Sequence, residues 1–172
     1  MSFYCISVHT GMEEKYKSNI QELLNSPETE LKGKIYFLKK KMRLKNGKEY
    51  FEPFFPGYVF FETKENDPQN LNILKQSKYF YHFLPSNNNI TQLSYRDLNI
   101  ITSILNYGNV IDIIPVTFDE NDRIVIVDGP FKDYSGKVIA VNRRNKRVNI
   151  QIDFLSDVKV IGLSYEVVKK QE

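Results

Sequence analysis

The spacing of apolar positions changes along the chain, and the change predicts two kinds of structure. In the first hundred or so residues, short apolar runs alternate with segments whose apolar residues are three or four positions apart. From about residue 122 onward, every apolar run is short and strand-like. We therefore predict an α+β fold: an N-terminal mixed sheet with helices, followed by a small C-terminal β-barrel.

Strands in the first part are predicted from runs of β-branched and aromatic residues. These runs cover residues 3–8, 34–45, 58–61 and 79–84. Helices are predicted where apolar residues return every three or four positions: over 12–24, from Asp67-Pro68, and from Ser94, whose hydroxyl can cap the helix. Asn46-Gly47 is a strong hairpin signal, because this pair favours a tight two-residue turn.

The rest of the chain is expected to form a linker and a separate β domain. Residues 110–119 contain Pro115 and no helical period. Further on, four apolar residues alternate strictly with polar ones, which predicts a strand with one buried face. They are Val148, Ile150, Ile152 and Phe154. The predicted domains are an N-terminal domain (1–106), a linker (107–119) and a C-terminal domain of about five short strands (120–172).

Composition narrows the class of protein. The chain is 41% hydrophobic and 26% charged, which fits a soluble protein with a packed core. No apolar run approaches the roughly 20 residues of a membrane span, and no signal peptide is recognised, so we expect a cytoplasmic protein with no membrane contact. Cys5 is the single cysteine, and His9 and His82 are far apart in sequence, so neither a disulfide nor a zinc site is expected.

Enzyme chemistry finds no support in the sequence. There is no glycine-rich phosphate loop, no nucleophile elbow and no metal-ligand spacing, so we predict neither a catalytic residue nor a cofactor. The net charge of +3 is only mildly basic. Any interaction with nucleic acid must therefore depend on local clusters of cations.

The stretch from Phe54 to Phe61 is the most distinctive in the chain, since five of its eight residues are aromatic. Pro56-Gly57 predicts a turn, because proline fixes φ and glycine accepts positive φ. One interpretation is a core strand with its entry turn. The other is that Phe55 and Tyr58 line an apolar depression that receives the tip of a partner's helix.

Three stretches resemble the NusG/Spt5 family of transcription elongation factors. They are Phe3-Tyr4 with Gly11, residues 54–59, and residues 128–138, which are similar to the KOW motif. The resemblance spans nearly the whole chain in the right order. It implies an N-terminal domain that binds the coiled-coil clamp helices of RNA polymerase, in a protein expected to act as a monomer.

The positions that match the family's polymerase-binding surface come from both early motifs. They are Phe3, Phe55, Pro56, Gly57 and Tyr58. Many relatives carry tryptophan where this chain has Phe3, which is a smaller anchor. Packing in the core is the alternative role for Phe3. His9, Thr10 and Lys15 match positions where a related specialised factor contacts the non-template DNA strand.

The branch of the family is read from the C-terminal domain. General NusG proteins carry Phe-Gly-Arg there, and the phenylalanine contacts Rho or ribosomal protein S10. This chain has Phe154-Leu155-Ser156-Asp157, so Phe154 is the matching partner contact, while glycine and arginine are missing. The tail looks more like LoaP, an operon-specific antiterminator that binds structured leader RNA. A housekeeping NusG and a ribosome-associated KOW protein that binds RNA without polymerase remain the alternatives.

Two clusters of cations are candidates for contact with nucleic acid. The first is one hairpin loop with Arg143, Arg144, Lys146 and Arg147, where each neutralised phosphate would release counterions. The second is the predicted hairpin from Lys39 to Lys48, which contains no acid between its ends. A solvated, charged turn is the alternative interpretation of each.

Overall fold

The computed structural model describes residues 1–64 and 68–169, and its contacts divide the chain into two compact units. The N-terminal unit comprises residues 1–38 and 55–98, and the C-terminal unit comprises residues 39–54 and 99 onward. The chain therefore enters the C-terminal unit once for a hairpin, returns, and enters it again. The hairpin groups with the C-terminal strands in these units, and the domain boundaries at residues 106 and 119 stay a prediction.

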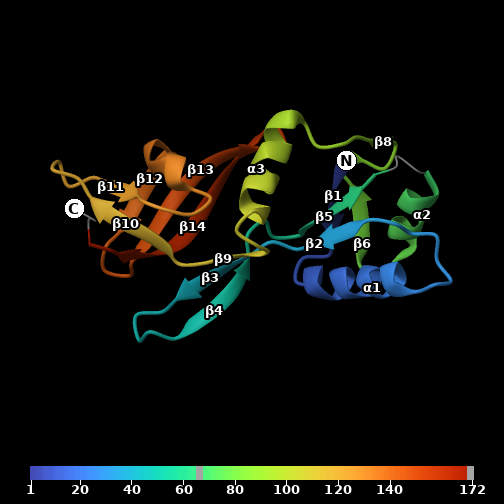
Figure 1. The fold of residues 1–172 in the computed structure, drawn as a ribbon, viewed down its shortest axis with the longest axis horizontal. Helices are drawn as coiled ribbons and strands as arrows, with labels where there is room; N and C mark the ends of the chain where they lie inside the picture. The colour runs from blue at the N-terminus through green and yellow to red at the C-terminus, as the bar shows by residue number, and fades with distance from the viewer. Residues whose placement is uncertain (65–67, 170–172) are drawn as a thin grey trace. The chain divides into compact units, whose positions relative to one another are not determined.

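The N-terminal unit is built on one antiparallel sheet with strand order β2-β5-β1-β6 (Figure 1). Its strands are β1 (Ser2–Val8), β2 (Lys34–Tyr36), β5 (Tyr58–Thr63) and β6 (Phe80–Phe83), and a short ladder joins β7 (Pro85–Ser86) to β8 (Asn89–Ile90). Its helices are α1 (Glu13–Asn25) and α2 (Pro68–Gln76). Asp67, the predicted cap of α2, lies outside the described residues.

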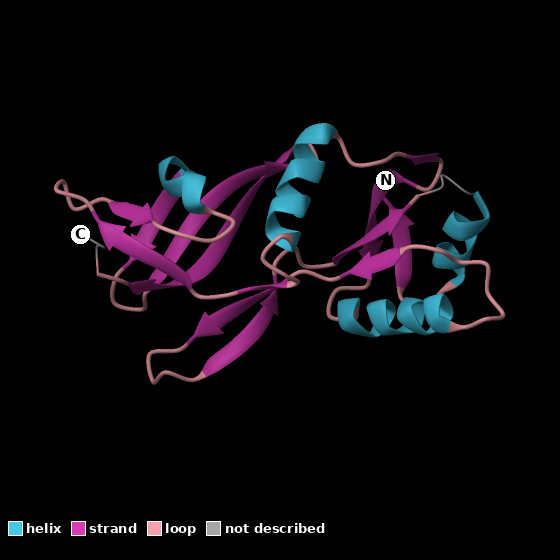
Figure 2. Ribbon diagram, viewed as in Figure 1, coloured by secondary structure: helices cyan, strands magenta, loops and turns pink. Residues whose placement is uncertain are grey.

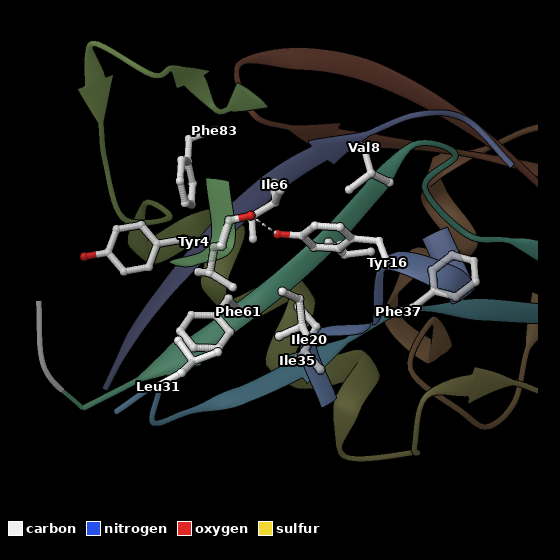
Figure 3. Packing of buried hydrophobic residues seen from close by; sticks show 12 residues of the cluster. Tyr4, Ile6, Val8, Tyr16, Ile20, Leu31, Ile35, Phe37, Phe61 and Phe83 are labelled. Atoms are coloured by element: carbon white, nitrogen blue, oxygen red, sulfur yellow. Dashed lines mark hydrogen bonds between the residues drawn. The ribbon is translucent and has the colours of Figure 1, made fainter. Parts of the chain in front are cut away.

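Both helices of this unit pack on one face of the sheet (Figure 3). Alternate residues of β1, including Tyr4 and Ile6, point into this core, together with Tyr16 from α1 and Leu74 from α2. The Tyr16 hydroxyl donates a hydrogen bond to the Leu74 carbonyl oxygen over 2.9 Å, so the aromatic ring fills space while its polar end is satisfied. The predicted spacing of apolar residues over 12–24 is confirmed as the buried side of α1.

A tight corner precedes β5. The Tyr58 N–H donates to the Phe55 carbonyl over 3.1 Å, and Gly57 has a φ of +80°, which is the pattern of a turn with proline second and glycine third. The Gly57 N–H donates to the Glu13 carboxylate over 2.7 Å, and Glu13 is only 2% exposed. The Pro-Gly turn was predicted, whereas the acid that holds it was not.

The C-terminal unit contains a curled five-stranded sheet with order β11-β10-β14-β13-β12 (Figure 2). Its strands are β10 (Ile114–Phe118), β11 (Ile124–Ile126), β12 (Val138–Asn142), β13 (Arg147–Phe154) and β14 (Asp157–Val167), with a 3-10 helix over Lys132–Lys137. Phe131 is buried before that helix and stacks on Phe54 from the end of the hairpin, with centroids 5.6 Å apart. The α+β fold class is confirmed.

The same unit holds a second sheet with order β4-β3-β9. It is formed by β3 (Lys39–Arg43), β4 (Glu49–Pro53) and β9 (Val110–Ile111). The hairpin predicted at Asn46-Gly47 joins β3 to β4, and Gly47 has a φ of +85°. The helix α3 (Tyr95–Leu105) begins as predicted, since the Asp97 N–H donates to the Ser94 hydroxyl over 3.1 Å.

Three predicted segments differ from the structure. The single strand expected over 34–45 is two strands in different sheets, because Phe37 and Leu38 are adjacent and both buried, which breaks the alternation of a strand. Residues 107–119, predicted as a linker, contain β9 and β10. The C-terminal strands were all expected to be short, but β14 (Asp157–Val167) runs over 11 residues with Gly162 inside it. Within the described residues, no helix is long and apolar enough to cross a membrane.

The turn between β13 and β14 places two non-glycine residues in the left-handed region. Leu155 has a φ of 53° and Ser156 a φ of 58°, while Phe154 and Asp157 pair across the turn. A two-residue hairpin loop of this kind favours asparagine and glycine, because both positions need positive φ. The chain therefore accepts backbone strain here.

Replacing Glu13 by alanine should lower the free energy of unfolding by about 1–3 kcal/mol, because the buried Gly57 N–H loses its acceptor. Urea unfolding and the hydrogen-exchange rate of the Gly57 amide measure the effect. Glu22→Ala on the exposed side of α1 is the control and should change stability by less than about 0.5 kcal/mol. Unchanged protection of the Gly57 amide in the Glu13 variant would contradict this role.

Ser156→Gly should raise the free energy of unfolding by up to about 1 kcal/mol, because glycine adopts positive φ without the clash of a Cβ atom. Ser103→Gly at an exposed position of α3 should instead lower it by about 0.5 kcal/mol, because glycine is a poor helix former. Thermal unfolding of the two variants side by side tests the opposite signs. A loss of stability in both would show that the turn is not strained.

Candidate functional site

The second face of the N-terminal sheet is aromatic. Cross-strand partners place Phe60 beside Tyr36, while Phe3 lies beside Glu62 on the same face. The rings of Phe3 and Tyr36 stack with centroids 6.1 Å apart. The Tyr36 hydroxyl donates to the Glu62 carboxylate over 2.6 Å. Burial, and then this hydrogen bond, raise the pKa of Tyr36 well above its ordinary value.

The residues predicted to bind RNA polymerase lie at two places, Phe3 opposite Glu62 and residues 55–58 at the start of β5, and they differ in exposure. Phe3 is 7% exposed and Phe55 3%, and the Phe55 ring packs edge-on against Phe60 with centroids 6.2 Å apart. Gly57 is also buried, whereas Pro56 is exposed and Tyr58 is half-buried. Pro56 and Tyr58 are thus the members of the set that reach the surface, while Phe3 and Phe55 pack inside. Their contact with polymerase stays a prediction.

The three residues predicted to contact DNA are all exposed. His9 and Thr10 directly follow β1, and Lys15 lies on α1. The His9 ring packs edge-on against Tyr81, with centroids 6.0 Å apart. Tyr81 is 65% exposed, and sequence reasoning did not single it out, since it lies within an aromatic strand pattern. Among the described residues, no group of three histidine, cysteine or acidic side chains could hold a metal ion.

The four cations of the β12–β13 loop fall into two pairs. Arg143 forms an ion pair with Asp122 at 2.8 Å and lies over the Phe118 ring, 4.2 Å from its centroid. Arg147 is half-buried and donates to the Arg43 carbonyl over 3.0 Å and to the Tyr50 hydroxyl over 3.2 Å. These two arginines are therefore already engaged in contacts within the unit.

Arg144 and Lys146 form the second pair. Both are exposed, and neither has an ion-pair partner within residues 1–64 and 68–169. The loop that carries them is ordered by local hydrogen bonds. The Asn145 N–H donates to the Asn142 side chain over 3.0 Å, and the Tyr165 N–H donates to the Lys146 carbonyl over 3.0 Å. Of the predicted cluster, Arg144 and Lys146 are thus the cations that the loop leaves available to a ligand.

The hairpin of β3 and β4 is attached to β14 by polar contacts. The Lys40 ammonium group is buried and donates to the Gly162 carbonyl over 2.6 Å, with the Glu52 carboxylate 3.6 Å away. Burial lowers the pKa of Lys40, and Glu52 partly opposes this shift. The Arg43 N–H also donates to the Ser164 hydroxyl over 3.0 Å. The alternative interpretation expected every cation of this hairpin to be solvated. The burial of Lys40 shows that at least one of them is not.

Phe154, the predicted partner contact of the C-terminal domain, is fully buried. It is one of the inward residues of β13, whose burial alternates over all eight positions as the sequence predicts. The residues that the adjoining turn presents to solvent are Ser156 and Asp157. Contact between Phe154 and a partner stays a prediction, and it would require this ring to leave the core.

Comparison with known protein families gives two matches in chain order. Residues 1–102 match the family model described as transcription termination factor NusG, and residues 120–151 match the KOW motif. The first match covers more than half of the 172 residues.

Relatives match over nearly their whole length. The transcription termination/antitermination protein NusG of Neisseria meningitidis is 22% identical, with 98% of this chain and 97% of the relative covered. The protein of the same name from Thermus thermophilus is 24% identical over 99% of this chain and all of its own. A solved structure of Thermotoga maritima NusG shares the fold, with a TM-score of 0.62, 23% identity, and coverage of 95% of this chain and 93% of that one. The chain belongs to the NusG family of transcription factors.

Proposed function

We propose that this protein is an elongation and antitermination factor that binds RNA polymerase through its N-terminal unit. The corner at Pro56-Gly57 carries the proposal. It combines an exposed proline and a half-buried tyrosine on a rigid turn, and the Glu13 carboxylate fixes that turn from behind. A rigid apolar corner of this kind can desolvate the tip of a partner's helix at low entropic cost. The clamp helices of polymerase are the partner that family membership favours.

We further propose a specialised, LoaP-like role in place of a housekeeping one. The turn that carries Gly-Arg in general NusG proteins is Leu155-Ser156 here, which removes the arginine expected to contact Rho or ribosomal protein S10. Arg144 and Lys146, which are exposed and have no ion-pair partner among the described residues, favour a nucleic-acid ligand for the C-terminal unit. A housekeeping NusG is the second candidate. A ribosome-associated RNA-binding protein is a weaker one, because it would have no use for the apolar corner.

Tyr58→Lys should abolish capture of RNA polymerase by the full-length chain, because a charge would have to be desolvated at the corner. Tyr95→Lys is the matched control: it makes the same change at a position that is 82% exposed and should capture polymerase like the unmodified chain. Thermal unfolding of both variants separates loss of binding from loss of fold. Polymerase capture by a folded Tyr58→Lys variant would refute the proposed surface.

The specialised role predicts a difference in partners for the full-length chain. It should shift a particular structured leader RNA in electrophoresis while forming no complex with Rho or with ribosomal protein S10. Titration of each partner against the chain at one salt concentration measures this, because affinities for RNA change steeply with salt. A complex with Rho, together with equal binding of all RNAs, would assign the chain to the housekeeping branch.

A further inference from the structure

The two basic clusters of the sequence, far apart in the chain, form the walls of one cleft in the C-terminal unit. One wall is the turn between β3 and β4, and the other is the β12–β13 loop, with residues of β14 between them. The residues that line this basic cleft are Arg43, Leu44, Lys45, Gly47, Arg144, Asn145, Lys146, Ser164 and Tyr165. Four of these nine residues are cations, and none is an acid.

Three of the four cations of the cleft have no ion-pair partner among residues 1–64 and 68–169. Arg43 is paired with Glu49 at 2.8 Å and with Glu166 at 3.3 Å. Lys45, Arg144 and Lys146 are exposed, and none has a carboxylate partner in the described part of the chain. One of these three comes from the hairpin and two from the loop, so positive charge faces the cleft from both sides.

The cleft is held open by contacts that do not use these three cations. Lys40 bonds to Gly162, Arg43 to Ser164, and Arg147 to the Arg43 carbonyl, which fixes the hairpin against β14 and the start of β13. A site whose walls are fixed before binding spends little free energy on ordering itself. One set of cations fixes the walls of the cleft, and a different set is available to a ligand. A preformed anion site requires this arrangement.

We propose that this basic cleft binds the phosphodiester backbone of nucleic acid, with Lys45 of the hairpin acting together with Arg144 and Lys146 of the loop. This rests on the proposed function in taking nucleic acid as the ligand of the C-terminal unit. It goes further by making the β3–β4 hairpin a part of the binding site. A backbone with regularly spaced phosphates fits three cations on two walls, and arginine suits phosphate by its fork of donors. The exposed amide of Asn145 adds a donor and an acceptor beside the charges.

The test is the salt dependence of binding by the full-length chain, with fluorescence anisotropy of a short labelled oligouridylate between about 50 and 200 mM salt. Three phosphate contacts predict a slope of log K against log salt of about −2 for a single strand. Lys45→Ala should weaken binding about two- to fivefold and reduce the slope by about 0.7. Arg144→Ala with Lys146→Ala should reduce it by about 1.4.

Lys137→Ala is the matched control, since Lys137 is an exposed cation at the opposite end of β12 and does not line the cleft. It should bind like the unmodified chain. A duplex DNA with the same label separates the two sources of the backbone, and binding to either supports the proposal if Lys45→Ala weakens it. An unchanged slope in Lys45→Ala would overturn the proposal, as would equal effects of Lys45→Ala and Lys137→Ala.

Polyglutamate is the competitor that tests for an acidic protein partner. If it displaces the oligonucleotide at equal charge concentration, the site recognises acidic chains in general and the proposal fails. Capture of RNA polymerase by the same variants is measured in parallel. If the unmodified chain captures polymerase but binds no nucleic acid, the proposal for the basic cleft is overturned and the polymerase-binding proposal stands. If the unmodified chain does not capture polymerase, the polymerase-binding proposal is overturned.

Discussion

A buried ammonium group determines how the C-terminal unit is assembled. Lys40 lies on a strand whose inward residues must find partners in β14, and its charge is stabilised there by the Gly162 carbonyl and the nearby Glu52. Burying a cation is costly unless its hydrogen bonds are made, so this contact specifies where the hairpin docks. Gly162 suits the position, because an added Cβ atom would come within 3.2 Å of the Asn149 side chain. The contacts of Arg43 and Arg147 follow from that docking.

Some cations of this protein make contacts within the fold and others are exposed to solvent, and the sequence alone does not distinguish the two groups. Arg143 and Arg147 bond to an acid, an aromatic ring or backbone carbonyls, while Arg144 and Lys146 between them remain exposed. In the hairpin, Lys40 is buried and Lys45 is exposed. Cluster counts overestimate the charge available to a ligand for this reason. The charge available to a ligand comes only from the cations that are not engaged in contacts within the fold.

Prediction from sequence succeeded where a pattern repeats over many residues and needs no distant partner. The eight alternating residues of β13, the apolar side of α1 and the Asn46-Gly47 hairpin are of this kind. The prediction fails at Phe37 and Leu38. These adjacent residues are both buried, so the sequence does not show that the chain passes from one sheet to another between β2 and β3. Prediction also fails for Glu13 and for the basic cleft, because both depend on partners far away in the chain and no local spacing encodes them.

The discontinuous C-terminal unit has a consequence for the order in which the protein is made. The hairpin emerges from the ribosome roughly 100 residues before β14, which corresponds to about 5–20 s of translation. The N-terminal unit, which extends to residue 98, is completed about halfway through that interval. The Lys40 ammonium must stay hydrated and the Met42 side of the hairpin uncovered until the last strand arrives. A newly made chain thus exposes the inward residues of its β3–β4 hairpin, Lys40 and Met42, until β14 is available to cover them.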